Sequence, residues 1–162
     1  MAGRSAERSR KSRRGVLDRD GAMALAFREL ARRSRSEAEI TATLAAHGAL
    51  PTVVRKVVGR LRSLGYVDDE KFAAACVERW TERGFGSLKI RAELSRHEIG
   101  EAIVERVALD SRVDGALARR VLARRFAARD LAEPRGMARA ARFLAARGFP
   151  AEVIDSLFDV CD

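Results

Sequence analysis

The chain has 162 residues and a net charge of +9, which allows one compact domain or a short array of small units. Alanine, leucine and arginine dominate, with 3 prolines and 1 tyrosine, a mixture that favours helix over sheet. There is no apolar run near the ~20 residues that cross a bilayer, no signal-peptide pattern in residues 1–14, and too few cysteines (Cys76 and Cys161) for a disulfide framework. The composition therefore excludes a membrane protein, argues against a disulfide-stapled secreted module, and predicts a cytoplasmic location.

Residues 1–20 are predicted to form a disordered basic arm. The segment carries seven basic residues and few large apolar ones, so it cannot bury a core. It is either simply solvated or takes a direct part in binding.

Three helices are predicted within residues 22–64. The first covers residues 22–33. The second begins with a capping box in which the side chains of Ser36 and Glu39 each satisfy an N–H group at the helix start. The third begins at Pro51, where the missing N–H costs nothing, and runs to residue 64. Gly48 and Gly65 end the second and third helices, because glycine adopts the left-handed conformation readily.

Six further helices are predicted in residues 69–109 and 114–160. Asp68, Ser87 and Asp114 are the expected N-caps of the fourth, fifth and seventh helices, while Pro134 and Pro150 open the last two. The predicted spans are about 69–83, 87–97, 100–109, 114–128, 134–148 and 150–160. Since no segment shows the strict alternation of a strand, we predict an all-α fold of nine short helices.

The sequence also repeats with a period of 50 residues. Leu44-Ala-Ala-His47-Gly48 matches Leu94-Ser-Arg-His97-Glu98 and Leu144-Ala-Ala-Arg147-Gly148. Such a period is typical of stacked helical units, so we predict three tandem three-helix repeats, 22–64, 69–109 and 114–160, in an elongated, curved body. Glu98 replaces the terminating glycine, and it must either avoid the left-handed conformation or accept a cost of roughly 1 kcal/mol.

Catalytic motifs are missing from the sequence. It contains no phosphate-binding loop, no H-E-x-x-H and no cysteine pair at metal spacing. His47, His97 and Arg147 share one repeat position, where a cation near a helix C-terminus is favoured by the helix dipole. We therefore expect no catalytic residues, no cofactor and no metal, and a protein that is not an enzyme.

Several groups of basic residues are candidates for contact with a partner or with DNA. On the third predicted helix they share the arc opposite the apolar residues Val53, Val54, Val57, Val58, Leu61 and Leu64, a separation typical of an amphipathic helix. The alternative for each group is a solubilising face, and Trp80 alternatively packs between two repeats. The candidates are Arg55, Lys56, Arg60 and Arg62; Arg79, Trp80 and Arg83; Lys89 and Arg91; and Arg119, Arg120, Arg124 and Arg125.

Charge is unevenly distributed along the chain. Residues 1–20 and 21–64 carry +4 and +5, residues 65–110 carry −3, and residues 111–162 carry +3. An acidic middle between basic flanks indicates at least one protein partner, beside a polyanion such as DNA.

Four short blocks of sequence carry a family resemblance. They are Ser36 to Glu39; Leu64-Gly-Tyr-Val-Asp-Asp69 with Phe72-Ala73; Arg83-Gly-Phe-Gly86 with Ile90-Arg91 and Glu93-Leu94; and Phe143-Leu144 with Arg147-Gly-Phe149. Over about residues 22–160 the chain resembles the bacterial RecX family, regulators of the RecA recombinase. The family's three tandem three-helix repeats agree with the period found above.

The resemblance implies binding in the deep groove of the RecA–DNA filament. It implies blocked filament extension, reduced ATP hydrolysis and reduced strand exchange, with no hydrolysis by the protein itself. We expect a monomer that contacts single- and double-stranded DNA weakly through phosphates. Two alternatives remain open, namely a sequence-independent DNA-binding protein without a recombinase partner and a helical scaffold for some other protein.

Overall fold

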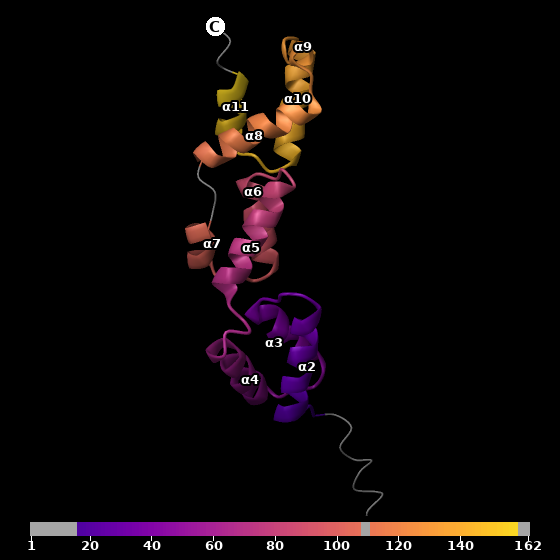
Figure 1. Ribbon diagram of the computed structural model, residues 1–162, viewed down its shortest axis with the longest axis vertical. Helices are drawn as coiled ribbons and strands as arrows, with labels where there is room; N and C mark the ends of the chain where they lie inside the picture. Colours follow the sequence, from indigo (N-terminus) through magenta and orange to yellow (C-terminus); the bar gives the residue numbers. More distant parts are fainter. Residues whose placement is uncertain (1–15, 108–110, 159–162) are drawn as a thin grey trace, which may run out of the picture. The chain divides into compact units, whose positions relative to one another are not determined.

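The computed structural model describes residues 16–107 and 111–158, and within them the chain is all-helical, as predicted. Apart from one isolated bridge between Leu17 and Ala49, these residues form ten helices and no strand. The chain divides into two compact units, Met1–Asp69 and Glu70–Asp162. Figure 1 shows the helices of each unit.

The first unit contains α2 (Arg19–Arg32), α3 (Glu37–Ala46) and α4 (Pro51–Ser63). Their apolar faces meet in one core, in which Ile40, Leu44, Val57 and Leu61 are almost completely buried. The predicted apolar arc of α4 is therefore correct except at Leu64, which lies one residue beyond the helix and is exposed.

The predicted N-terminal arm includes residues that belong to the folded unit. Asp18 accepts a hydrogen bond from the N–H of Gly21 at 2.9 Å and caps α2, which begins at Arg19 instead of Ala22. The N–H of Leu17 also donates to the carbonyl of Gly48 at 3.1 Å. Residues 1–15 lie outside the described part of the chain.

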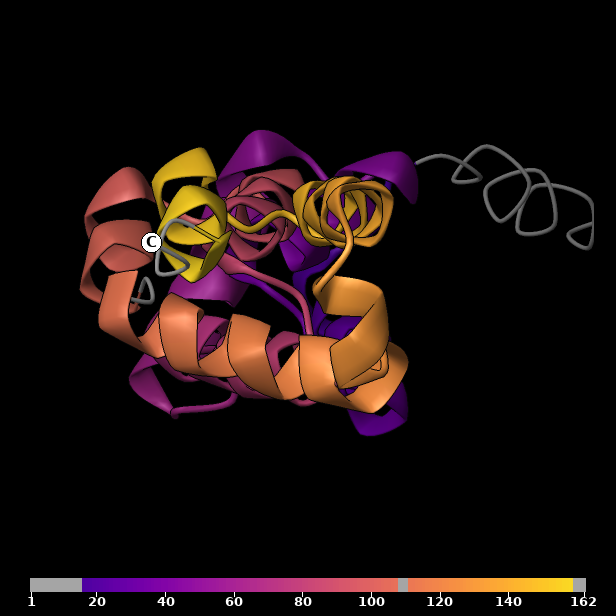
Figure 2. The same ribbon diagram turned by 90° about the horizontal axis from the view of Figure 1, so that it is seen from above.

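The second unit contains seven helices around two further cores. One core includes Phe72, Ile90 and Leu94, and the other includes Leu144 and Phe149. Figures 1 and 2 show α8 crossing the direction shared by α10 and α11. The helices are α5 (Asp69–Glu82), α6 (Ser87–Arg96), α7 (Glu101–Val107), α8 (Ser111–Arg125), α9 (Ala128–Leu131), α10 (Pro134–Ala146) and α11 (Ala151–Phe158).

The number of cores supports the predicted repeats. Residues 16–107 and 111–158 contain three separate clusters of buried side chains, one for each expected group of helices. The repeat boundaries themselves and the elongated, curved shape stay predictions. The expected helix ends at residues 109 and 160 lie outside the described residues.

Two predicted caps are wrong, and the same contact explains both. Gly86 occupies the N-cap position of α6, and Ser87 is the first residue of that helix. Asp114 does not begin α8 but lies in its first turn, 1% exposed, where its carboxylate accepts the N–H of Ser87 at 3.1 and 3.3 Å. Asp114 thus satisfies the start of a different helix from the one it was expected to cap.

The short helix α9 was missed by the sequence prediction. The seventh predicted helix was expected to continue to about residue 128, but α8 ends at Arg125. The Asp130 carboxylate accepts the N–H of Ala127 at 3.3 Å, which starts a new helical turn. The hydrogen bond between Asp130 and Ala127 therefore accompanies a break in the segment that was predicted to be one helix.

Five helix ends share one geometry, in which the residue after the C-cap adopts the left-handed conformation. Four of these residues are glycines, as predicted, and the fifth is Glu98, with φ of 54°. The N–H of Glu98 donates to Ser95 and that of Ile99 to Leu94, the pattern also made by Gly148 and Phe149. Glu98 therefore takes the strained alternative left open by the sequence. The four glycines are Gly48, Gly65, Gly84 and Gly148.

Replacing the strained residue should stabilise the second unit. We expect Glu98→Gly to raise the free energy of unfolding by about 1 kcal/mol, because glycine adopts positive φ without a Cβ clash. Glu78→Gly is the control, since it places glycine inside α5 and should destabilise by roughly 0.5–1 kcal/mol. Urea unfolding measures both changes, and a destabilised Glu98→Gly variant would contradict the assignment.

Removing the Asp114 carboxylate should be costly. Asp114→Ala leaves the buried N–H of Ser87 without its acceptor, and we expect a loss of about 2 kcal/mol in unfolding free energy. Asp114→Asn retains an acceptor oxygen and should lose less. The exposed Asp155 serves as the control, with Asp155→Ala expected within ~0.5 kcal/mol of wild type. Equal stability of all three variants would refute the role of this contact.

Candidate functional site

The first candidate surface is the basic face of α4, defined by Arg55, Lys56 and Arg60. All three side chains are exposed, and none makes an ion pair within the described residues. Gly59 lies among them on the helix, and a Cβ built there would meet no atom within 4 Å. The surface between the three cations is therefore bare, which permits the close approach of an anionic partner.

Arg62, the fourth residue predicted for this face, has a structural partner instead. Its guanidinium donates from Nε to Glu37 Oε1 at 2.5 Å and from Nη2 to Glu37 Oε2. This hydrogen bond and the charge of Glu37 raise the pKa of Arg62. Arg62 thus ties the end of α4 to the start of α3 and is not free for a partner.

The other acidic residues of this unit's helical region are engaged in the same way. Glu29 binds Arg35 at 2.6 Å, and Glu39 binds Arg33 at 2.6 Å. Residues 21–64 contain only three acidic residues, Glu29, Glu37 and Glu39, against a net charge of +5. Four of these five excess positive charges reside on the α4 face and on Arg28 of α2, since the remaining arginines pair with the three glutamates. This distribution favours a binding role for α4 over a solubilising face of mixed sign.

Asp69 completes the start of α3. Its carboxylate accepts the N–H of Glu37 at 2.9 Å, and burial raises its pKa. Because the pKa of Asp69 is higher in the folded chain than its ordinary value, its contribution to the free energy of unfolding is present at low pH and is lost as the pH rises through the folded-state pKa. Its hydrogen bond to Glu37 assigns Asp69 a structural role in the first unit.

In the second unit Trp80 is packed and only partly exposed. Its ring meets that of Phe85 edge-on at 4.9 Å, and the Arg83 guanidinium lies 4.7 Å from its centroid. Trp80 packs against the core formed by Phe72, Ile90 and Leu94. It supports Arg83, and it is not presented to a partner as a free aromatic anchor.

Arg147 joins two loops of the second unit. Its Nη1 donates to the carbonyl of Arg83 at 2.8 Å and to that of Gly84 at 3.2 Å. Its guanidinium also lies 5.1 Å from the Phe85 ring and 4.9 Å from the Phe143 ring. The side chain is therefore fixed in place by backbone acceptors and by aromatic faces on two elements.

The same loops approach each other through their backbones. The N–H of Gly86 donates to the carbonyl of Arg147 at 2.9 Å, and the N–H of Leu88 donates to Gly148 at 3.0 Å. A Cβ on Gly86 would lie 2.5 Å from the Gly148 oxygen. Glycine is thus required at position 86 by the closeness of the two chains.

Beside this junction lies the arginine hollow, a cavity of about 230 Å³. Five arginines line it, three from α8 and one each from the residue that follows α5 and the residue that follows α10, together with one carboxylate, Glu82. Within the described residues none of the five arginines is paired with a carboxylate. The arginines are Arg83, Arg120, Arg124, Arg125 and Arg147.

The hollow brings together some predicted residues and leaves others out. Arg83 meets three of the four α8 arginines there, and the sequence had placed them in separate groups. Lys89 pairs instead with Glu93 at 3.4 Å, and Arg91 lies 3.9 Å from Glu101. Arg79 is exposed elsewhere on α5. Arg147, which was interpreted only as a helix-end cation, is the residue that sequence reasoning missed.

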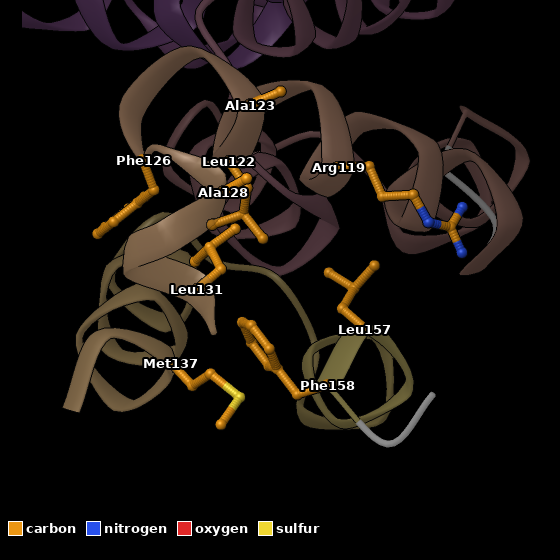
Figure 3. Close-up of a pocket in the computed structure, with 9 residues that line it drawn as sticks. All are labelled: Arg119, Leu122, Ala123, Phe126, Ala128, Leu131, Met137, Leu157 and Phe158. Carbon is orange, nitrogen blue, oxygen red and sulfur yellow. The ribbon is translucent and has the colours of Figure 1, made fainter. Parts of the chain in front are cut away.

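A second hollow, of about 520 Å³, is apolar (Figure 3). Leu131, Leu157 and Phe158 point into it, and Arg119 extends away from these side chains. Arg119 is therefore separated from its neighbour Arg120, which faces the arginine hollow. The remaining lining residues are Leu122, Ala123, Phe126, Ala128 and Met137.

Neither hollow has the residues of a metal centre. Throughout residues 16–107 and 111–158, no three His, Cys, Asp or Glu side chains gather as a metal site would require. Among the helices of the same residues, none is long and apolar enough to cross a membrane. What the described surface offers is cationic charge on α4 and in the arginine hollow.

Comparison with known proteins assigns the chain to a family. It is 40% identical over 129 residues to the regulatory protein RecX of Thermus thermophilus, covering 80% of this chain and 84% of that protein. It is 37% identical to the regulatory protein RecX of Halorhodospira halophila over 80% of this chain and 81% of that one. The chain belongs to the RecX family.

Other comparisons agree with this membership. The family description for the second three-helix domain of RecX matches residues 68–107, which include Arg83. The crystal structure of RecX from Lactobacillus salivarius matches with a TM-score of 0.72 and 18% identity, covering 88% of this chain and 95% of that one. This likeness concerns the fold. RecX proteins are regulatory proteins and not enzymes.

The position of Arg147 predicts a large effect of its removal. We expect Arg147→Gln to lower the free energy of unfolding of this RecX protein by about 1–2 kcal/mol, because two carbonyl acceptors, one of them partly buried, and two ring contacts lose their partner. Arg142→Gln on the same helix is the matched control and should stay within ~0.5 kcal/mol of wild type. Chemical denaturation compares the two, and equal stability would show that the Arg147 contacts are dispensable.

Proposed function

We propose that the chain inhibits a RecA recombinase by lodging in the groove of the RecA–DNA filament. Membership of the RecX family carries the proposal, and two unpaired basic surfaces support it. Occupation of the groove blocks filament extension, ATP hydrolysis and strand exchange by steric means. No chemical step by this chain is involved.

The charges suggest how the contact is divided. The α4 face offers Arg55, Lys56 and Arg60 to DNA phosphates or to an acidic surface of the recombinase. The net −3 charge of residues 65–110 faces basic protein loops that otherwise hold DNA. Arg83 is an exception within this acidic segment, since it belongs to the arginine hollow. The chain acts as a monomer in the cytoplasm.

The test is ATP hydrolysis by the cognate RecA on single-stranded DNA. We expect inhibition at ratios of this protein far below the DNA concentration in nucleotides, because each bound molecule acts on a whole filament. Inhibition that appears only when the protein coats the DNA would favour the second candidate, a sequence-independent nucleic-acid binder. The arginine hollow is the observation that supports this second candidate. No inhibition at all would refute the recombinase role.

Charge reversal on α4 gives a sharper form of this test. The triple variant Arg55→Glu, Lys56→Glu, Arg60→Glu should raise the concentration for half-inhibition at least about tenfold, because attraction to the filament becomes repulsion. Arg62 is left unchanged, since it binds Glu37.

The control for this variant carries the same change in charge elsewhere. It reverses three exposed arginines of the second unit, as Arg129→Glu, Arg135→Glu and Arg142→Glu. Circular dichroism checks that both variants are folded. If the two lose inhibition equally, net charge and not the α4 face governs binding.

A further inference from the structure

The arginine hollow concentrates more positive charge than a solvated surface needs. Five guanidiniums line a cavity of about 230 Å³, and Glu82 is the one carboxylate among its lining residues. Solubilising faces usually mix both signs, and like charges held close together repel one another. Since none of the five arginines makes an ion pair within the described residues, the arrangement calls for an anion from outside.

Two of the arginines are already held in position. Arg147 is fixed by the carbonyls of Arg83 and Gly84 and by two aromatic rings. Arg83 lies over Trp80, at 4.7 Å from the ring centroid. A guanidinium has five N–H donors, and the bonds of Arg147 to the carbonyls of Arg83 and Gly84 both use Nη1. Its remaining donors can serve a ligand without further ordering of the side chain.

From this geometry we propose that the arginine hollow binds the phosphate backbone of a nucleic-acid strand. Arginine forks match phosphate oxygens in a bidentate manner. Guanidiniums on several sides of one cavity can surround a tetrahedral phosphate, whereas a carboxylate is planar and suits one fork. Arg120 and Arg124 are one turn apart on α8, so a row of cations follows the helix and can meet successive phosphates. This assignment specifies the nucleic-acid contact proposed above.

The test uses the full chain without any recombinase. Fluorescence anisotropy of a labelled single-stranded oligonucleotide measures affinity at several salt concentrations. We expect the variant Arg120→Gln, Arg124→Gln to bind about tenfold more weakly, with the slope of log affinity against log salt reduced by about 1.4 for two lost phosphate contacts. Both side chains are exposed on α8, so the variant should fold.

The matched control is Arg135→Gln, Arg142→Gln, which removes the same charge from exposed positions of α10 outside the hollow. It should keep the wild-type salt slope. Inorganic phosphate, compared with chloride at equal ionic strength, should weaken oligonucleotide binding to wild type more than to the hollow variant. Equal loss in both variants, or equal competition by phosphate, would overturn the proposal.

An acidic polypeptide provides the remaining arm of the experiment. If the hollow variant binds the oligonucleotide as the control does but loses binding to poly-glutamate, the hollow takes acidic protein and the proposal is wrong. Because no recombinase is present, failure here leaves the ATP-hydrolysis result standing. Failure of that assay with normal oligonucleotide binding at the hollow would instead refute only the recombinase role.

Discussion

Two helices of the chain begin at an N–H group whose acceptor is a carboxylate about 30 residues further along the sequence. Asp69, the first residue of α5, accepts the first N–H of α3, and Asp114 in the first turn of α8 accepts the first N–H of α6. Free N–H groups at a helix start must find acceptors when they are buried. Each such bond therefore makes the start of a helix depend on a residue far along the chain, within the first unit for Asp69 and within the second for Asp114. Helix capping in this chain thus depends on distant residues as well as on neighbouring ones.

Features that depend on neighbouring residues were predictable from the sequence. The capping box of Ser36 and Glu39 forms as expected, and so do the glycine ends and the proline starts of α4 and α10, because capping acts over three or four residues. The period of 50 residues also located equivalent helix ends, since His47, His97 and Arg147 are all C-caps. The predictions fail at Asp114 and at α9, where a carboxylate can accept from more than one nearby N–H group. Packing of the helices determines which of these hydrogen bonds forms.

The candidate surfaces were predictable as charge but not as geometry. A helical wheel places Arg55, Lys56 and Arg60 on the outer face of the helix. It cannot predict that Arg62 forms an ion pair with Glu37, which is 25 residues away in the sequence. Arg83 and the α8 arginines line one cavity although they are far apart in the sequence, and Arg147 bonds to the loop that carries Arg83. The sequence shows which side chains carry charge, whereas the fold determines which of these charges form ion pairs within the chain.

The backbone contact between Gly86 and Gly148 has a consequence for cooperativity. The N–H groups of Gly86 and Leu88 donate to the carbonyls of Arg147 and Gly148, and the Arg147 side chain donates back to Arg83 and Gly84. Opening this junction leaves polar groups on both sides without partners, so we expect the helices that it joins to unfold cooperatively. In hydrogen exchange, amides on both sides of this junction should form a single protected unit. A chain that ends at residue 107 lacks the carbonyl partners of Gly86 and Leu88, so we expect its remaining helices to be less protected than they are in the full chain.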